Sequence, residues 1–195
     1  ETVLRQCAHP GGAAICGAML WYPDETIQHA GIVTGLGGYA GHSHKYKKKG
    51  GSGYLFRTST VQDFSGVTGA CLLVKTAVYD EMHGLDEQFA VAFNDVDFCL
   101  RVRDAGYRIA WTPYAELIHY ESKSRGGDEK DPVKAARFAA EQQRLYTIHG
   151  KENILDDPYY NPNLTRDRED FSESDDLRRL KEGRVTVRFR GGILQ

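Results

Sequence analysis

Cysteine is sparse in this sequence, and its cysteines stand far apart. Four occur among 195 residues, namely Cys7, Cys16, Cys71 and Cys99, and no two of them form a C-x-x-C pair. This spacing argues against zinc ribbons and dithiol redox motifs. Cys71 and Cys99 lie in apolar runs, where a free thiol behaves as a small buried hydrophobe. We therefore expect reduced thiols and a cytoplasmic protein.

Long apolar runs and a strong excess of charge are also lacking. No run approaches the roughly 18–20 residues that span a bilayer, so no transmembrane segment is expected. Residues 1–5 lack the basic-then-apolar order of a signal peptide, and the sequence does not begin with Met, which is typical of a fragment. The formal net charge of -2 argues against a general nucleic-acid binder.

The sequence does contain alternating strand-like and helix-like segments, which predict an α/β fold. Expected strands cover residues 13–21, 27–33, 67–74, 107–111 and 115–118, and expected helices cover 76–84, 95–105 and 132–150. The glycine- and lysine-rich stretch 35–53 is expected to be a mobile loop. We assign residues 1–150 to one domain and 151–195 to an extended acidic C-terminal tail, in which 156–176 are not expected to pack.

Residues 35–40 match the G-x-G-x-x-A pattern of dinucleotide-binding proteins. That motif needs a helix directly after it, because the helix N-terminus binds the pyrophosphate. Here His42, His44 and a run of lysines follow without helical periodicity. We instead expect a loop that carries histidine and lysine towards a phosphorylated or polar ligand.

Two carboxylates, Asp95 and Asp97, lie at the start of the expected helix 95–105. Acids in a first turn stabilise the free amides and the helix dipole, and Asn94 is a suitable N-cap. The D-x-D spacing is also that of a metal site, but the positive end of the dipole disfavours a cation there. The alternatives are a purely structural pair, or one carboxylate that acts as a general base in a cleft.

His119 follows the last expected strand. A single histidine in that position is more often a hydrogen-bonded structural residue than a ligand. Imidazole nevertheless suits a divalent metal when carboxylate ligands lie nearby.

Several segments, in order, resemble the second half of bacterial family 2 glycosyltransferases of the O-antigen and rhamnosyl-transfer type. The main ones are 67–74 (VTGACLLV), 84–89 (GLDEQF), 94–101 (NDVDFCLR) and 105–108 (AGYR). Further matches are 22–24 (YPD), 27–31 (IQHAG), 111–117 (WTPYAEL) and 157–163 (DPYYNPN). The resemblance covers about residues 1–172.

The resemblance implies the C-terminal part of a GT-A fold, with a mixed sheet and flanking helices. It implies inverting transfer of a sugar from a nucleoside-diphosphate donor to a glycan or lipid-linked acceptor, in cell-wall or O-antigen polysaccharide synthesis. Peripheral association with a membrane is compatible with such an acceptor. The cofactor implied is a divalent metal, Mn²⁺ or Mg²⁺.

The resemblance also implies roles for individual residues. The general base maps to Asp95 and a metal ligand to His119. Supporting positions on the acceptor and donor sides map to Thr68, Gly69, Asn94 and Asp97. The family usually has Glu-Asp where this sequence has Asn94 and Asp95, which is a departure from its pattern.

The donor-binding half of the family, with its metal-binding D-x-D, is expected to precede residue 1, because D-x-D occurs here only at 95–97. The alternative function is a non-catalytic carbohydrate-binding or interaction module with the same fold. A third reading is a metal-binding protein that uses His42, His44 and His119.

Overall fold

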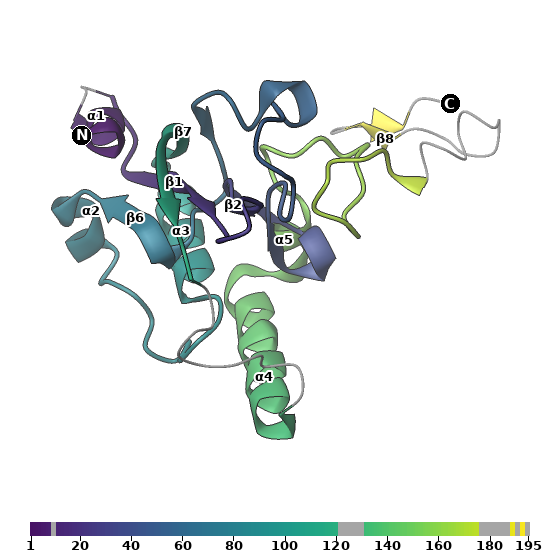
Figure 1. The fold of residues 1–195 in the computed structure, drawn as a ribbon. Helices are drawn as coiled ribbons and strands as arrows, with labels where there is room; N and C mark the ends of the chain where they lie inside the picture. Colours follow the sequence, from purple (N-terminus) through teal and green to yellow (C-terminus); the bar gives the residue numbers. More distant parts are fainter. Residues whose placement is uncertain (9–10, 121–130, 176–187, 190–191, 194–195) are drawn as a thin grey trace.

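The computed structural model describes residues 1–8, 11–120, 131–175, 188–189 and 192–193. These residues form a mixed sheet with helices on both faces, which confirms the expected α/β class (Figure 1). In these ranges no helix has the length and apolar character needed to cross a bilayer.

The strands are β1 (Ile15–Trp21), β2 (Ile27–His29), β3 (Ile32–Thr34), β4 (Ala40–His42), β5 (Gln62–Asp63), β6 (Leu72–Val74), β7 (Ile109–Ile118), β8 (Arg188–Phe189) and β9 (Gly192–Ile193). The α-helices are α1 (Thr2–Ala8), α2 (Thr76–Glu81), α3 (Asn94–Asp104), α4 (Pro132–His149) and α5 (Lys151–Leu155). Short 3₁₀ helices are η1 (Leu36–Gly38), η2 (Tyr54–Phe56) and η3 (Gly69–Cys71).

Strand β1 is the centre of a five-stranded sheet and is buried over its whole length, as its apolar sequence predicts. β7 pairs with it in parallel along one edge. On the other edge, β6 pairs antiparallel with the start of β1, and β2 pairs antiparallel with its end. β5 adds an antiparallel strand beyond β7, while β3–β4 and β8–β9 form separate two-stranded ladders.

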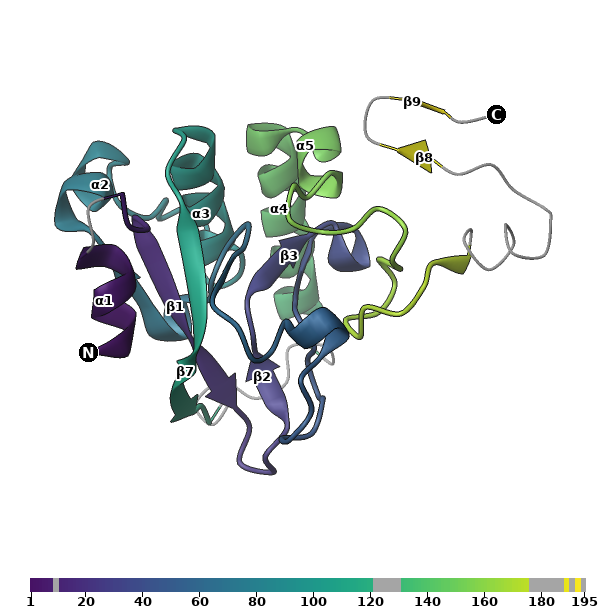
Figure 2. The ribbon, with the colours of Figure 1, turned by 90° about the horizontal axis from the view of Figure 1, so that it is seen from above.

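Helices α1 and α3 lie on opposite faces of the sheet (Figure 2). On one face Cys7 of α1 packs with Cys16 and Ala110. On the other, Phe98 of α3 packs with Ile15 and other sheet residues. The alternation of neighbouring residues between the two faces follows from the two-residue period of a strand. Helix α3 is thereby fixed at the sheet, with α4 and α5 beyond it.

Strand β7 is one strand where the sequence predicts two. Thr112 stands opposite Ala18, but the next partner, Met19, stands opposite Glu116. Residues 113–115 therefore form a bulge in a continuous strand. Pro113 has no N–H for the ladder, which accounts for the interruption at this position.

The expected strand 27–33 is divided into β2 and β3 by Gly31. Its φ is +97°, and a Cβ there would lie 2.5 Å from the Phe64 ring, so both backbone and space require glycine. The glycine- and lysine-rich stretch after β3 is also ordered, which corrects the expectation of a mobile loop. Within it β4 pairs with β3, and His44 is buried.

Helix α3 begins and ends close to the predicted residues, but its start differs in detail. The N-cap is Phe93, with φ +63° and no side-chain cap, so the prediction that Asn94 is the cap is wrong. A non-glycine residue in the left-handed region is strained, and such strain is often found beside functional sites. Gly106, with φ +88°, ends the helix as predicted.

Two other predicted segments agree in part with the structure. Helix α4 has the expected cap, since Asp131 accepts from Val133 N–H at 2.9 Å, and it ends at Gly150. The expected strand 67–74 is extended only at its end, in β6, because its middle forms η3.

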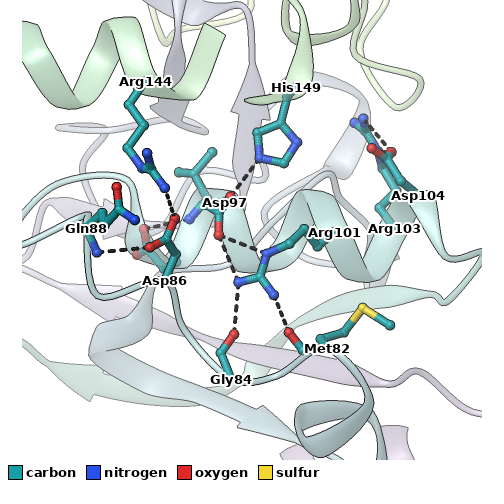
Figure 3. A network of polar contacts seen from close by, with 12 residues as sticks. Met82, Gly84, Asp86, Gln88, Asp97, Arg101, Arg103, Asp104, Arg144 and His149 are labelled. Atoms are coloured by element: carbon teal, nitrogen blue, oxygen red, sulfur yellow. Dashed lines mark hydrogen bonds and ion pairs between the residues drawn. The ribbon is translucent and has the colours of Figure 1, made fainter. Parts of the chain in front are cut away.

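Helix α4 holds the loop that leads into α3. Arg144 Nη2 lies 2.6 Å from Asp86 Oδ2, and this contact lowers the pKa of Asp86 (Figure 3). The buried Glu141 carboxylate accepts from Val91 N–H at 3.3 Å and from Ala92 N–H at 2.7 Å. The residues just before Asp95 are therefore tied to α4 at three points.

Asp97 joins α3 to both neighbours from a buried position, with 1% exposure (Figure 3). Its Oδ1 lies 2.8 Å from His149 Nε2 at the end of α4. Its Oδ2 accepts from Arg101, whose other nitrogens donate to the carbonyls of Met82 and Gly84 at 2.5 and 2.9 Å. One carboxylate thus organises the turn after α2, helix α3 and the end of α4.

The segment 157–172 packs into the core, which corrects the expectation that residues 156–176 do not pack. Its apolar side chains Tyr160, Leu164 and Phe171 are buried in the main cluster. Asp157 accepts from Thr34 N–H at 2.7 Å, which fixes the segment to β3.

We predict that Phe171→Ala lowers the free energy of unfolding by about 3–5 kcal/mol. The Phe171 ring is buried against Tyr160 and stacks on the His44 ring, with the two ring centroids 4.2 Å apart. Urea titration followed by circular dichroism measures this change in stability. Phe56→Ala, at a side chain with 66% exposure, is the control and should change stability little. Equal, small effects would show that the segment does not contribute to the core.

We also predict that Asp97→Asn lowers the free energy of unfolding by about 3 kcal/mol, because an amide cannot compensate both His149 and Arg101. Asp95→Asn is the matched control two residues away, and we expect it to cost less than about 1 kcal/mol, since the new amide oxygen still accepts a hydrogen bond. If Asp97→Asn is as stable as the unmodified chain, the network of Figure 3 is not a stabilising one.

Candidate functional site

A cleft of about 1250 Å³ opens beside the start of α3. Four of the six predicted site residues line it: Gly69, Asn94, Asp95 and His119. The cleft therefore brings together two parts of the chain, η3 and the start of α3, with the residue that follows β7.

Asp95 is one of three acidic residues that line this cleft, and the other two, Asp167 and Glu169, belong to the segment after α5. Oδ2 of Asp95 accepts from Gly69 N–H at 2.8 Å, and its Oδ1 accepts from Val96 N–H at 2.8 Å. Backbone donors and the N-terminus of α3 both favour a negative charge at this point. The side chain is held in place by the protein, yet it lines an open space, as a proton acceptor for a ligand must.

Gly69, Thr68 and Asn94 support this arrangement in different ways. A Cβ on Gly69 would lie 3.6 Å from Asp95 Cβ, so the contact does not itself require glycine. Thr68 does not line the cleft; its Oγ1 accepts from Ala70 N–H at 3.4 Å and keeps η3 in shape. Asn94 Oδ1 accepts from Asp95 N–H at 2.7 Å.

Asp97 is not part of the cleft wall, because its carboxylate points into the network with Arg101 and His149. The two carboxylates of the D-x-D sequence are therefore directed to different surroundings. This geometry agrees with a structural Asp97 and leaves Asp95 as the candidate for chemistry.

His119 lines the same cleft, directly after β7. Its backbone N–H donates to Trp21 O at 2.9 Å, which fixes the residue to the end of β1. Its Nδ1 is buried and has no hydrogen-bond partner among the residues that the structure describes. An unpaired buried nitrogen is costly unless a ligand or an ion completes it.

The described ranges contain no group of three or more His, Cys, Asp or Glu that could hold a metal ion. The third reading, with His42, His44 and His119 as ligands, fails at His44. That imidazole is buried, with Nδ1 2.7 Å from Ser43 Oγ and Nε2 accepting from Tyr54 N–H at 3.0 Å. Burial, followed by Lys47 and Arg57, lowers the pKa of His44 to about 4.

His42 and Lys45 line the cleft, which agrees with the expected loop that carries histidine and lysine towards a ligand. The sequence did not indicate the other charged residues or the aromatic part of the cleft. Arg166 and Arg168 contribute positive charge, Asp167 and Glu169 contribute negative charge, and Tyr39, Phe93 and Phe138 contribute aromatic surface. The arginines come from residues 151–195, which the composition predicts to be an extended tail. The aromatic residues come from three separate elements, so no local pattern could have grouped them.

Glu169 extends this wall. Its Oε1 accepts from His42 N–H at 3.2 Å, and burial raises the pKa of its carboxyl, against the opposing effect of Lys45. The polypeptide segment after α5 is thus linked directly to β4 at the cleft.

No protein-family model matches the chain. It is 48% identical over 161 residues to an uncharacterized protein, y4gI, of Sinorhizobium fredii, covering 82% of this chain and 18% of that protein. It is 33% identical over 166 residues to the O-antigen biosynthesis protein RfbC of Myxococcus xanthus, covering 85% of this chain and 12% of the relative.

A shorter match is to the N-acetylglucosaminyl-diphospho-decaprenol L-rhamnosyltransferase of Mycobacterium tuberculosis, 32% identical over 80 residues, or 41% of this chain and 24% of that protein. In each case the chain spans less than a quarter of the relative's length. It is similar to short segments of much longer proteins, one named for O-antigen biosynthesis and another for rhamnosyl transfer.

Proposed function

We propose that this chain is the acceptor-side part of a family 2 glycosyltransferase with a GT-A fold, and that it contributes the general base to an inverting sugar transfer. The observation that carries the proposal is the carboxylate of Asp95, held by Gly69 N–H at 2.8 Å on the wall of a large cleft. The names of the relatives support a glycosyltransferase-like family.

In this proposal Asp95 takes the proton from an acceptor hydroxyl as its oxygen attacks the anomeric carbon of the donor sugar. The nucleoside diphosphate leaves from the opposite face, so the configuration inverts. A sugar hydroxyl is a weak nucleophile, and a positioned base accelerates such a step by roughly 10²–10⁴-fold. The aromatic residues of the cleft suit the apolar faces of a sugar ring.

A divalent metal, Mn²⁺ or Mg²⁺, would stabilise the charge on the departing diphosphate. The described residues fit one ligand for it, His119, whose buried Nδ1 lacks a partner in those ranges. Asp97 is committed to Arg101 and His149 and does not fit. We propose that the remaining ligands and the donor pocket belong to a part of the protein that this sequence does not include.

The donor is proposed to be a nucleoside-diphosphate sugar, and the acceptor a glycan or a lipid-linked sugar, in the cytoplasm or at its membrane surface. A non-catalytic carbohydrate-binding module is less favoured, because such a module would not need a carboxylate held by backbone donors at the cleft. The substitution of Asn94 for the usual Glu leaves Asp95 as the acidic residue at this point of the cleft.

We predict that Asp95→Asn lowers kcat about 10²–10⁴-fold in a longer protein in which these residues are joined to a donor-binding half. Transfer is measured with a panel of nucleotide sugars and divalent metals. Asp104→Asn, at an exposed acid on the same helix, is the control and should keep near-normal activity. If Asp95→Asn transfers sugar at the rate of the unmodified protein, Asp95 is not the base.

We predict that this chain alone binds Mn²⁺ weakly and that, in the longer protein with nucleotide, His119→Ala weakens Mn²⁺ binding by about 10-fold or more. One imidazole gives little affinity without carboxylate partners. Calorimetric titration measures both, with His83→Ala as a control at an exposed histidine outside the cleft. Tight binding that survives His119→Ala would place the metal elsewhere.

A further inference from the structure

Apart from two histidines, the charged residues that line the cleft are balanced in sign. Three are basic and three are acidic: Lys45, Arg166, Arg168, Asp95, Asp167 and Glu169. Residues 166–169 alternate in sign along the chain, and Lys45 acts on the carboxyl of Glu169. Opposite charges this close together largely cancel each other's field, so the wall favours a neutral polar ligand over an ion of either sign.

Three aromatic residues that line the same cleft form a row with Phe93 in the middle. The Phe93 ring centroid lies 6.3 Å from that of Tyr39 and 5.2 Å from that of Phe138. Phe138 is 42% exposed, and Phe93 and Tyr39 are partly buried. Phe93 also packs against the core cluster that contains Leu145 and Ile154. Its side chain is therefore supported by the core and still borders the cleft.

Hydrogen bonds on both sides of Phe93 hold its backbone in the left-handed conformation, with φ +63°. Before it, the N–H groups of Val91 and Ala92 donate to the buried carboxylate of Glu141. After it, Asp97 N–H donates to the carbonyl of Phe93 at 2.8 Å. A bulky residue adopts this conformation only where its surroundings enforce it. The place of the Phe93 ring is thus set by the protein before any ligand binds.

The aromatic row and the proposed base meet at the start of α3. Phe93 is the N-cap of this helix and Asp95 is its second residue, with the Asp95 carboxylate fixed by Gly69 N–H at 2.8 Å. A pyranose ring has two matching surfaces, a face of C–H groups for an aromatic ring and an edge of hydroxyls for a carboxylate. Apolar surface with a few placed polar groups is what orients a small ligand.

We infer that Phe93, flanked by Tyr39 and Phe138, is the platform on which a neutral pyranose ring stacks, and that it positions a hydroxyl of this ring at Asp95. Holding two reacting groups together in this way lowers the entropic part of a barrier. That the sugar is the acceptor of a transfer reaction rests on the proposed function. The stacking of a neutral pyranose on Phe93 does not.

The probe is N-acetylglucosamine, a neutral sugar whose ring substituents are mainly equatorial, so that C–H groups occupy its faces. NMR titration of the 195-residue chain measures both affinity and geometry. We expect the C–H signals of the bound sugar to move upfield, because these protons lie over the face of an aromatic ring. A purely structural role of Phe93 would not produce this shift.

Substitutions along the row separate stacking from packing. Phe93→Leu keeps an apolar side chain against the core but removes the ring, and we expect about 3- to 10-fold weaker binding and no upfield shift. Phe93→Tyr keeps the ring and should bind within about twofold of the unmodified chain. Phe138→Leu changes an exposed side chain, so it should bind about twofold more weakly at an unchanged Tm. Phe56→Leu, outside the cleft, is the control and should change neither.

A parallel titration with N-acetylglucosamine 1-phosphate tests the preference for a neutral ligand. Because the acidic and basic residues balance, we expect the two affinities to agree within about threefold. Binding of the phosphate more than about 10-fold tighter would overturn the inference, since charge and not the ring would then dominate. No binding of N-acetylglucosamine, a bound sugar without upfield shifts, or unchanged affinity in both Phe93→Leu and Phe138→Leu would overturn it as well.

Failure of the proposed function has a different signature. In that case the longer protein transfers no sugar, or Asp95→Asn has no effect on transfer, while the sugar still shows upfield shifts that Phe93→Leu removes. Conversely, transfer that depends on Asp95 together with an unshifted sugar would overturn the stacking platform and leave the proposed function standing.

Discussion

The rest of the site depends on the contacts that the buried carboxylate of Asp97 makes with Arg101 and His149. The carboxylate fixes Arg101, and through it the carbonyls of Met82 and Gly84, while its other oxygen fixes His149. Burying a charge is unfavourable unless it is paired, so these partners are required together. Because Asp95 is two residues earlier on α3, the position of the cleft carboxylate is set by a group that never reaches the cleft.

Local sequence patterns predicted α3, and the family resemblance assigned different roles to its two acids. The sequence signals for this helix are acidic residues after a loop, an apolar face, and Gly106 at the end. In the structure Asp95 lines the cleft, whereas Asp97 is buried in the interior. β1 was equally clear, because a short apolar run buried on both faces has few alternatives. The cap at Phe93 was not predictable, since a left-handed non-glycine residue has no sequence signal.

Contacts between distant segments could not be predicted. The segment after α5 is polar in composition, and its apolar residues stand singly, yet Tyr160 and Phe171 enter the core once Asp157 is bonded to β3. The same holds for the pairing of His29 with His42, which depends on the turn at Gly31. Composition reports the average character of a segment, whereas these features depend on a few residues at particular points.

The return of the C-terminal segment to β3 and β4 has a consequence for folding during synthesis. Thr34 and Asp157 are 123 residues apart, and His42 and Glu169 are 127 apart. Closing such long loops is slow, and the early strands cannot acquire these partners until nearly the whole segment has left the ribosome. The sheet can therefore form while the chain is still growing, but the last part of the core and the wall of the cleft are completed together, once the segment 157–172 has been synthesised.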